Sequence, residues 1–365
     1  MTSTVREPRQ TSDPHDAVEA EIRALFSRSS GTAQAYGADF SRLWSLAGEH
    51  MQGGKLVRPR LLLDTYIALS QNTRGGWADT RSAVRVAAAV EALHYAFLLH
   101  DDVIDGDLYR RGRPNLIGEL ARTTADEARA GAVSHWAQAG GILAGSLLLS
   151  GAHQVFARID APAVERIRLL DLLDHTVFET TAGEFTDVGL SDGLVAPDLD
   201  TVLAMTRRKT ASYSFELPLR AAAILAGAAP ELEHALSAAG SHLGLAYQLQ
   251  DDLLSTFGDA HEHGKDPYSD LREGKQTAII CFARLSGLWP YIAEDFGDPD
   301  LTLTSAERLR DRLRECGAEE FVSGLVQQQL AGFYDVLAAT GTGAVPSAVR
   351  EVLLALAERI EGRRS

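Results

Sequence analysis

The sequence predicts an all-α protein built as one large domain. Alanine, leucine, arginine and glutamate, which are good helix formers, dominate its 365 residues. Apolar residues recur at helical spacing, as in Val84, Ala87, Ala88, Leu93, Phe97 and Leu98. Alternating strand patterns between tight-turn dipeptides are missing, and no G-x-G-x-x-G follows a strand, so a dinucleotide-binding fold is not supported.

The N-terminal residues are polar and mixed in charge, without an apolar signal core. We therefore expect a disordered leader over 1–16 and a single domain over 17–365. Glycine and proline then separate the helical stretches, at about 71–80, 105–115, 189–198, 257–275 and 340–346. Pro218 interrupts the helical run 213–225. It either kinks this helix and frees a carbonyl near Ser214, or begins a new helix.

Composition limits the class of function. Fifty acidic against 35 basic residues give a formal net charge of −15, which argues against nucleic acid as a partner. A small anionic substrate remains possible because it needs only a local basic pocket. Two cysteines form neither a disulfide framework nor a zinc site, which fits a cytoplasmic protein. No run of about 18 apolar residues predicts a membrane-spanning helix.

The first of two acidic clusters ends an apolar helical run. Asp101, Asp102 and Asp105 follow the mostly apolar residues 95–100. Asp101 and Asp105 would lie on one helix face, about 6 Å apart, where their repulsion costs stability unless a cation neutralises it. Mg²⁺ takes oxygen ligands of this kind. A solvated helix end is the alternative, but acids at a helix C-terminus oppose its dipole.

The second cluster, Asp251 and Asp252, closes the apolar run 243–249. Either cluster alone is a weak signal, but together they predict facing helices that clamp metal ions bridging a polyphosphate. Such a substrate also needs protein cations. The sequence offers them beside glycines or acidic motifs, at Lys55, Arg58, Arg110, Arg111, Lys209, Lys265 and Lys275.

In this order the motifs resemble those of the trans-isoprenyl diphosphate synthases. The matching segments lie within about residues 50–280: Gly53-Gly54-Lys55 with Arg58-Pro59, Glu91 to His94, Asp101 to Asp105, Arg110 to Pro114, Gly183 to Asp187, Lys209-Thr210, Gln248 to Asp252, Gly264-Lys265 and Asp270 to Lys275. Each motif is moderately specific, whereas the ordered set is highly specific.

The resemblance implies an isoprenoid-synthase-type helical bundle around a central cavity, usually as a homodimer. It implies a chain-elongating prenyltransferase that condenses isopentenyl diphosphate with an allylic diphosphate (dimethylallyl, geranyl or farnesyl), head to tail and in the trans configuration. Three Mg²⁺ ions, or Mn²⁺ in their place, would act as Lewis acids on the leaving diphosphate. An apolar cavity would exclude water from the allylic carbocation.

The resemblance also implies a role for each matching residue. The metal ligands would be Asp101, Asp105 and Asp251, with Asp102 and Asp252 in support. The allylic diphosphate would be held by Arg110, Lys209 and Lys265, with Lys275 close by. Isopentenyl diphosphate would be held by Lys55, Arg58, His94 and Arg111, although a core histidine is the alternative for His94. Thr210 and Gln248 would lie beside the bond that ionises.

Product length is expected to depend on the residues one turn before the first cluster. Ala96 and Phe97, five and four positions before Asp101, would form the floor of the product cavity. One is small and one is bulky, and the cluster carries no two-residue insertion. Resemblance to actinobacterial-type members with Ala-Phe here points to geranylgeranyl diphosphate (C20), with farnesyl diphosphate (C15) as the alternative.

Two other interpretations use the same motifs. Ser255 stands where the fullest family pattern has a third aspartate, and residues 251–259 loosely resemble the second metal motif of class I terpene cyclases. A cyclase binds no isopentenyl diphosphate and would not need Lys55, Arg58 and Arg111. A non-catalytic regulatory subunit would be expected to lose an acidic motif, and this chain keeps both.

The chain has 31 arginines but only four lysines, and all four lysines lie within predicted diphosphate motifs. An ammonium is a compact point charge, whereas a guanidinium is a planar fork. Replacing Lys55, Lys209 or Lys265 by arginine is therefore expected to impair function although the charge is kept.

Overall fold

The computed structural model describes residues 13–70, 79–110, 112–124, 130–258 and 268–362, and it confirms the all-α prediction. Strands are limited, in these ranges, to the antiparallel pair β1 and β2. In chain order the elements are α1 (Pro14–Ala35), α2 (Ala38–Met51), α3 (Val57–Ser70), α4 (Thr80–Ile104), β1 (Tyr109–Arg110), β2 (Arg113–Pro114), α5 (Leu116–Thr124), α6 (Ala130–Ala157), α7 (Ala163–Ser191), α8 (Leu199–Thr206), the π-helix η1 (Arg207–Glu216), α9 (Leu217–Leu225), α10 (Pro230–Phe257), α12 (Ser269–Arg272), α13 (Ala278–Arg284), α14 (Trp289–Ile292), α15 (Leu303–Glu315), α16 (Ala318–Ala338) and α17 (Ser347–Glu361).

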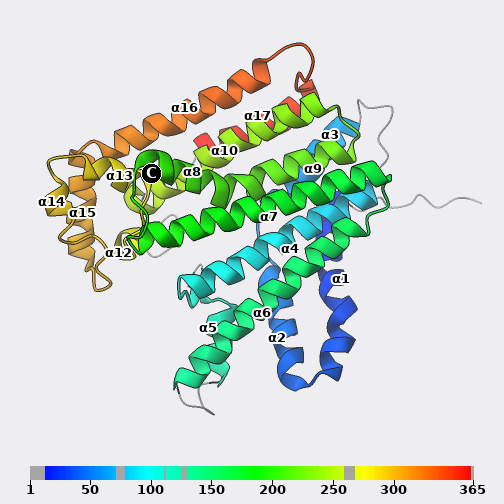
Figure 1. Ribbon diagram of the computed structural model, residues 1–365, viewed down its shortest axis with the longest axis horizontal. Coiled ribbons are helices and arrows are strands. Elements are labelled where there is room, and N and C mark those ends of the chain that lie inside the picture. The colour runs from blue at the N-terminus through cyan, green and yellow to red at the C-terminus, as the bar shows by residue number, and fades with distance from the viewer. Residues whose placement is uncertain (1–12, 71–78, 111, 125–129, 259–267, 363–365) are drawn as a thin grey trace, which may run out of the picture.

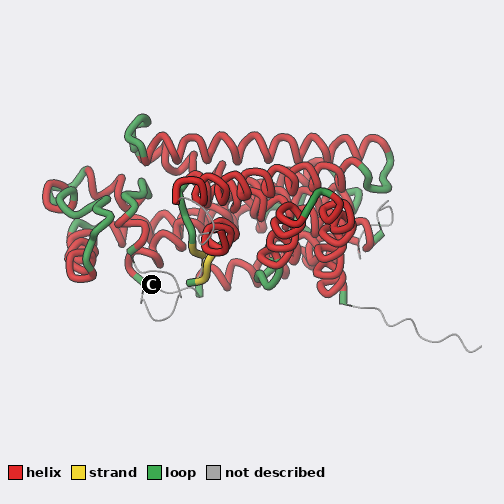
Figure 2. The backbone as a smooth tube through the Cα atoms, turned by 90° about the horizontal axis from the view of Figure 1, so that it is seen from below, coloured by secondary structure: helices red, strands yellow, loops and turns green. Residues whose placement is uncertain are grey.

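The long helices form the body of the bundle. α4 packs mainly on α6, and α10 packs on both α16 and η1. Helices α1, α2 and α5 lie along the lower side of the view in Figure 1, whereas α12 to α15 lie at its left end. Seen from below, the short strand pair lies near the edge of the bundle, with helices above it and to its sides (Figure 2). Buried side chains from nearly all of these helices join in one continuous core.

Local signals explain several helix starts. The Asp13 carboxylate accepts the N–H of His15 (3.0 Å), and Pro14 occupies the first turn of α1. The last three residues of the expected leader are therefore helical, while residues 1–12 lie outside the described ranges. The Asp79 carboxylate likewise caps α4 by accepting the N–H of Ser82 (2.8 Å).

The chain runs without a break from α8 through η1 into α9. Pro218 lies in the first turn of α9, where its missing N–H is tolerated, and the backbone stays helical from η1 into α9. The departure from α-helical geometry precedes the proline. It is the π-helix η1, at whose end the Leu217 N–H donates to the Ser212 carbonyl.

Two glycines allow other helices to approach η1 closely. A Cβ atom on Gly183 of α7 would lie 2.4 Å from the backbone nitrogen of Lys209. A Cβ atom on Gly244 of α10 would lie 2.4 Å from the Cβ of Ala211. The backbone of η1 is therefore held between α7 and α10 at distances that larger residues would not permit.

Two helices, α4 and residues 131–157 of α6, are long and apolar enough to cross a membrane. Their most apolar stretches are 72% and 44% buried within the bundle, respectively. The burial of α4 is that of a core helix. The less buried α6 carries an apolar surface.

Candidate active site

The first acidic cluster lies at the C-terminal end of α4. The helix stops there because the Asp105 N–H closes the last turn on the Asp101 carbonyl (2.8 Å) and Gly106 follows with a φ of +74°. Desolvation and repulsion from Asp101 raise the pKa of Asp105 to about 6. Asp102 is 3% exposed and accepts a hydrogen bond from Arg110 (2.5 Å), and Arg110 also lies 3.6 Å from Asp101.

Lys209 joins η1 to this cluster. Its ammonium lies 3.0 Å from Asp101, 2.9 Å from Glu184 and 2.7 Å from Asp187. Burial alone would lower the pKa of Lys209, but these carboxylates raise it well above its usual value. Burial also raises the pKa of Glu184 to about 7, with repulsion from Asp101 adding to it. One lysine therefore neutralises carboxylates from α4 and α7.

The donor set around Lys209 fits a divalent metal ion. One oxygen of Glu184 and one of Asp187 are buried without a hydrogen-bond partner. Such groups stabilise a cation, and Mg²⁺ is commonly held by one or two carboxylates together with substrate phosphates. Within the described part of the chain, no three His, Cys, Asp or Glu side chains are grouped so that they could hold a metal ion by themselves. An open arrangement of this kind leaves coordination positions for a substrate.

The second acidic cluster lies on α10 and is tied to η1 by hydrogen bonds. The Thr210 hydroxyl donates to the Gln248 carbonyl oxygen (3.3 Å), and the Gln248 amide donates to Asp252 (2.9 Å). Burial raises the pKa of Asp252 to about 7, and the charge of Asp270 adds to this. The Ser255 hydroxyl donates to the Asp270 carboxylate of α12 (2.5 Å). Asp270 is thus a third carboxylate beside this cluster.

Charges from the two clusters act on shared neighbours. Burial raises the pKa of Glu273 to about 7, and it does so together with repulsion from Asp270 and from Asp105 of the first cluster. Asp270 most strongly raises the pKa of Lys275 above its usual range, with Asp252 and Asp187 contributing. η1 contacts the first cluster through Lys209 and the second helix through Thr210 and Gln248, while the facing of the two clusters across a metal-bound diphosphate stays a prediction.

A second group of residues surrounds Tyr213 of η1. The Arg58 side chain donates from Nε and Nη2 to the Ser214 hydroxyl (3.1 and 2.8 Å) and from Nη2 to the Tyr213 hydroxyl (3.2 Å). The Tyr213 ring stacks on His94 (5.6 Å between centroids) and meets Phe97 edge to face (5.3 Å). Two residues predicted to bind isopentenyl diphosphate thus lie beside one predicted to limit product length.

The remaining predicted residues divide into three cases. Lys55 is exposed in the loop before α3. Arg111 and Lys265 lie outside the described residues. Ala96 is completely buried, and a Cβ atom on Gly145 of α6 would lie 3.1 Å from its carbonyl oxygen, so it lies where α4 packs on α6.

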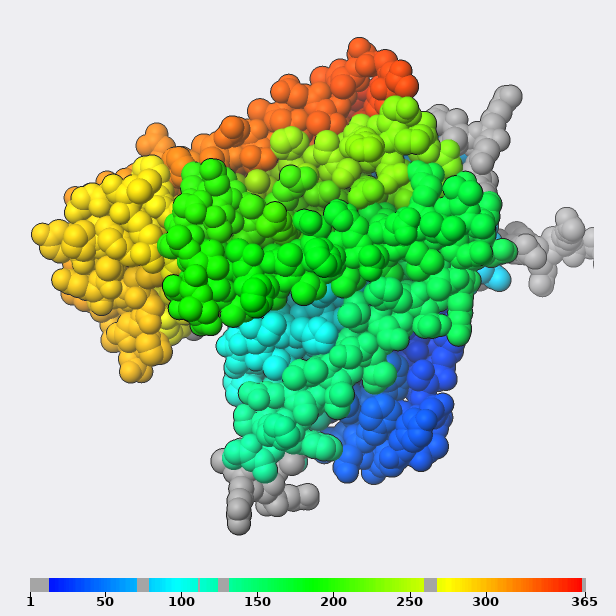
Figure 3. Space-filling view, in the orientation of Figure 1, coloured from blue at the N-terminus to red at the C-terminus, as the bar shows by residue number. Residues whose placement is uncertain are grey.

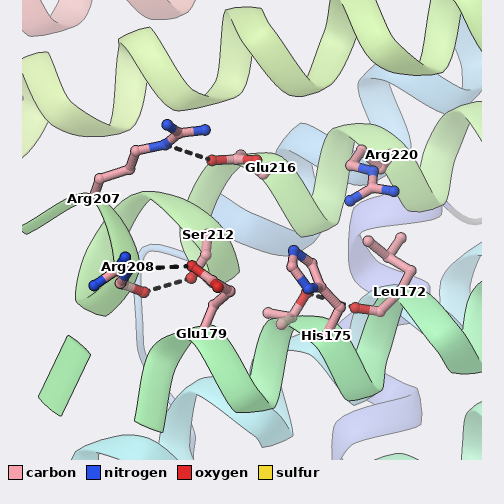
Figure 4. A pocket seen from close by; sticks show the side chains of 9 residues that line it. Leu172, His175, Glu179, Arg207, Arg208, Ser212, Glu216 and Arg220 are labelled. Atoms are coloured by element: carbon pink, nitrogen blue, oxygen red, sulfur yellow. Dashed lines mark hydrogen bonds and ion pairs between the residues drawn. The ribbon is translucent and has the colours of Figure 1, made fainter. Parts of the chain in front are cut away.

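The structure contains two cavities, of which one borders the first acidic cluster. One, of about 380 Å³, is lined by Asp102 and by mainly apolar residues of α4, α5 and α6. The other, of about 50 Å³, lies between α7 and the helices η1 and α9 (Figure 4). In it Arg207 faces Glu216 (3.7 Å) and Arg208 faces Glu179 (3.6 Å), so its cations are already compensated. None of the predicted site residues lines this smaller cavity.

Sequence reasoning assigned no role to Glu184, Asp187, Tyr213 or Asp270. Glu184 and Asp187 belong to the family motif Gly183 to Asp187. The sequence pattern that could have identified them is a pair of acids three positions apart, and therefore on one face, of a largely apolar helix. Asp270 also lay within a recognised motif, but its contact with Ser255 depends on how the chain returns to α10. Tyr213 gave no signal of its own, since an aromatic residue in a helical run is ordinarily a core residue.

The chain is similar to known proteins in both sequence and fold. The profile of the polyprenyl synthetase family matches residues 43–287. A geranylgeranyl diphosphate synthase of Methanosarcina mazei is 31% identical over 75% of this chain and 76% of its own. A (2E,6E)-farnesyl diphosphate synthase of Mycobacterium bovis is 29% identical over 81% and 76%. The crystal structure of geranylgeranyl pyrophosphate synthase from Corynebacterium glutamicum, complexed with isoprenyl diphosphate and magnesium, is 27% identical with a TM-score of 0.87 over 96% of this chain and 98% of that one. With its profile matched over most of its length and its fold shared, the chain belongs to the polyprenyl synthetase family.

Proposed function

We propose that this protein is a Mg²⁺-dependent, chain-elongating trans-prenyltransferase that condenses isopentenyl diphosphate with an allylic diphosphate to make geranylgeranyl diphosphate. The observation that carries the proposal is the position of Lys209. Its ammonium lies among Asp101, Glu184 and Asp187 on one side of η1, while Thr210 reaches the second acidic cluster through Gln248. One short segment thus serves both clusters, as binding a diphosphate between them requires.

Each set of residues has a distinct task. Asp101, Asp105 and Asp251 would hold three Mg²⁺ ions. These ions would supply Lewis-acid stabilisation of the charge on the leaving diphosphate. The allylic diphosphate would be bound by Lys209, Arg110, Lys265 and Lys275. Lys209 and Arg110 now contact carboxylates and would exchange part of these contacts for phosphate oxygens. Isopentenyl diphosphate would be bound by Lys55, Arg58, His94 and Arg111.

The chain's own residues also protect the reaction. Phe97 and Tyr213 are in contact, and their rings would line the cavity next to the predicted ionisation site. Such walls keep water from the allylic carbocation while the double bond of isopentenyl diphosphate attacks it. A proton then leaves the new unit, and the departed diphosphate is the base at hand. Of the two residues expected to form the floor of the product cavity, only Phe97 is bulky, which supports a C20 product rather than a C15 product.

A homodimer is part of the proposal. Helices α6 and α7 lie side by side on one face of the molecule (Figure 3). These two helices expose large apolar side chains, and Phe178 and Phe185 are 74% and 80% exposed; the others are Trp136, Ile142, Leu143, Leu147, Val164 and Ile167. Exposed apolar side chains in this number favour a second copy of the chain as the partner. We place the protein in the cytoplasm, in agreement with its two unpaired cysteines.

The test is a product assay with the purified protein and Mg²⁺. Isopentenyl diphosphate is incubated with dimethylallyl, geranyl or farnesyl diphosphate in turn, and the products are identified by mass spectrometry. Geranylgeranyl diphosphate is expected from each primer. Mainly C15 product would overturn the chain length, and a hydrocarbon formed from geranylgeranyl diphosphate alone would favour a cyclase. No condensation with any primer would refute the proposal.

A further inference from the structure

Tyr213 lies between the two substrate functions of the site. It contacts Arg58 of α3 through its hydroxyl, and its ring contacts His94 and Phe97, which lie on one face of α4. The Arg58 guanidinium also lies 4.8 Å from the centre of the ring. No other aromatic side chain in the described residues shares these contacts, so one residue touches both an expected diphosphate ligand and the expected cavity floor.

The hydroxyl groups of Tyr213 and its neighbour orient Arg58. A guanidinium has five N–H groups in a fixed plane. In Arg58 the Nε hydrogen and those of Nη2 are directed to the Ser214 and Tyr213 hydroxyls. The two hydrogens on Nη1 have no acceptor among the described residues. The contacts therefore fix the plane of the guanidinium and leave one edge available for an anion.

The ring of Tyr213 serves a different purpose. Phe97 precedes Asp101 by one helical turn, and its ring is packed edge to face against Tyr213 with an interplanar angle of 64°. Stacking on His94 with an interplanar angle of 23° holds the ring from a second side. A ring fixed on two sides moves little, so Tyr213 and Phe97 together make a stiffer barrier than Phe97 alone.

We propose that Tyr213 is both a positioning residue for isopentenyl diphosphate, acting through Arg58, and a determinant of product length, acting through Phe97. The inference rests on the proposed prenyltransferase function. The two roles belong to different parts of one side chain: the hydroxyl fixes Arg58, and the ring forms the barrier. They can therefore be separated by substitution.

The experiment compares Tyr213→Phe with Tyr213→Leu in the full chain, using the same assay of products from each primer. Tyr213→Phe removes only the hydroxyl. It is expected to raise the KM for isopentenyl diphosphate about three- to tenfold, because Arg58 loses one orienting hydrogen bond but keeps both contacts with Ser214. The KM for the allylic substrate and the product length should stay unchanged. Tyr213→Leu removes the ring as well, and it is expected to shift products beyond the length of the wild-type product.

Each half of the inference has its own refutation. An unchanged KM for isopentenyl diphosphate in Tyr213→Phe overturns the positioning role, and unchanged products in Tyr213→Leu overturn the length role. Wild-type protein without prenyltransferase activity would instead refute the proposed function. Should Tyr213→Leu fail to fold, Tyr213→Met can replace it, because the flexible methionine side chain fills more of the space of the lost ring. Its products are then compared with those of the wild type in the same way. A change in kcat alone, with both KM values and the products as in wild type, contradicts both roles.

Discussion

Replacing Lys209 by methionine tests the electrostatic centre of the site. Lys209 is 22% exposed at its side chain and lies 2.7–3.0 Å from three carboxylates. Methionine keeps most of the length but leaves Asp101, Glu184 and Asp187 facing one another. Breaking a buried ion pair by removing one partner costs about 3–5 kcal/mol. Proton uptake by Glu184, whose pKa is already about 7, offsets part of this, so we expect a loss of about 2–3 kcal/mol in the free energy of unfolding.

The assay is urea unfolding at pH 6 and pH 8, with and without Mg²⁺. A carboxyl whose pKa is raised in the folded state stabilises the fold at low pH and loses this effect as the pH rises through that pKa. The deficit of Lys209→Met is therefore expected to be larger at pH 8 than at pH 6. Mg²⁺ alone should stabilise the variant more than the wild type, because the three carboxylates are then free to bind it.

The matched control is Lys55→Met, since Lys55 is exposed and its loss should change stability by no more than about 0.5 kcal/mol. A Lys209→Met protein as stable as the Lys55→Met protein, at both pH values and with the same response to Mg²⁺, would show that the three contacts have no energetic weight. Lys209→Arg extends the comparison. It keeps the charge, so it should recover part of the stability but still lower turnover, because a planar fork does not match acceptors from two helices.

Three further variants test other parts of the site. Gly183→Ala places a Cβ 2.4 Å from the backbone of η1 and should lower the free energy of unfolding, measured in urea, by about 1–3 kcal/mol. Its control is Gly151→Ala, whose Cβ would have no neighbour within 4 Å and which should be neutral or slightly stabilising. Equal effects of the two substitutions would contradict the close approach of α7 to η1. Ser255→Ala removes the hydrogen bond that orients the Asp270 carboxylate, so it should raise the Mg²⁺ concentration needed for half-maximal activity. In an Asp270→Asn background the same substitution should have no such effect, and an effect of equal size in both backgrounds would argue against the contact. Asp101→Ala should lower turnover by about a hundredfold or more, and near-normal kcat would remove Asp101 from the metal site.

The acidic clusters were predictable from the sequence because acids at the ends of buried helices repel one another and oppose the helix dipole unless a cation compensates them. In the structure, a cation of the protein itself compensates Asp101, because Lys209 lies in contact with it. Asp102, the next residue, points elsewhere and pairs with Arg110. A helix turns by about 100° per residue, so neighbouring aspartates face different partners. The catalytic and binding roles themselves stay predictions until the variants are measured.

The π-helix was beyond the reach of sequence reasoning. Residues 207–216 contain no glycine or proline, and their composition would suit an ordinary helix. What fixes their geometry lies on other helices, where Gly183 and Gly244 let α7 and α10 close on η1 from two sides. A π-helix is rare and common at functional sites, and here it carries Lys209 and Tyr213. The contact of Ser255 with Asp270 was hidden for a related reason, since it joins α10 to a helix that follows a loop.

The distribution of charge suggests why metal and substrate would bind together. The chain is acidic overall, with a net charge of −15, and its four lysines all fall within the predicted diphosphate motifs. Lys209 and Lys275 lie among carboxylates that raise their pKa values, so each is protonated and already neutralises part of an acidic cluster. A diphosphate arriving alone would have to draw these lysines from Asp101 or Asp270 and leave the acids exposed to one another. A divalent ion arriving alone would meet the lysines as competing cations. Binding both at once removes each conflict, because the metal takes over the carboxylates while the lysines turn to phosphate oxygens.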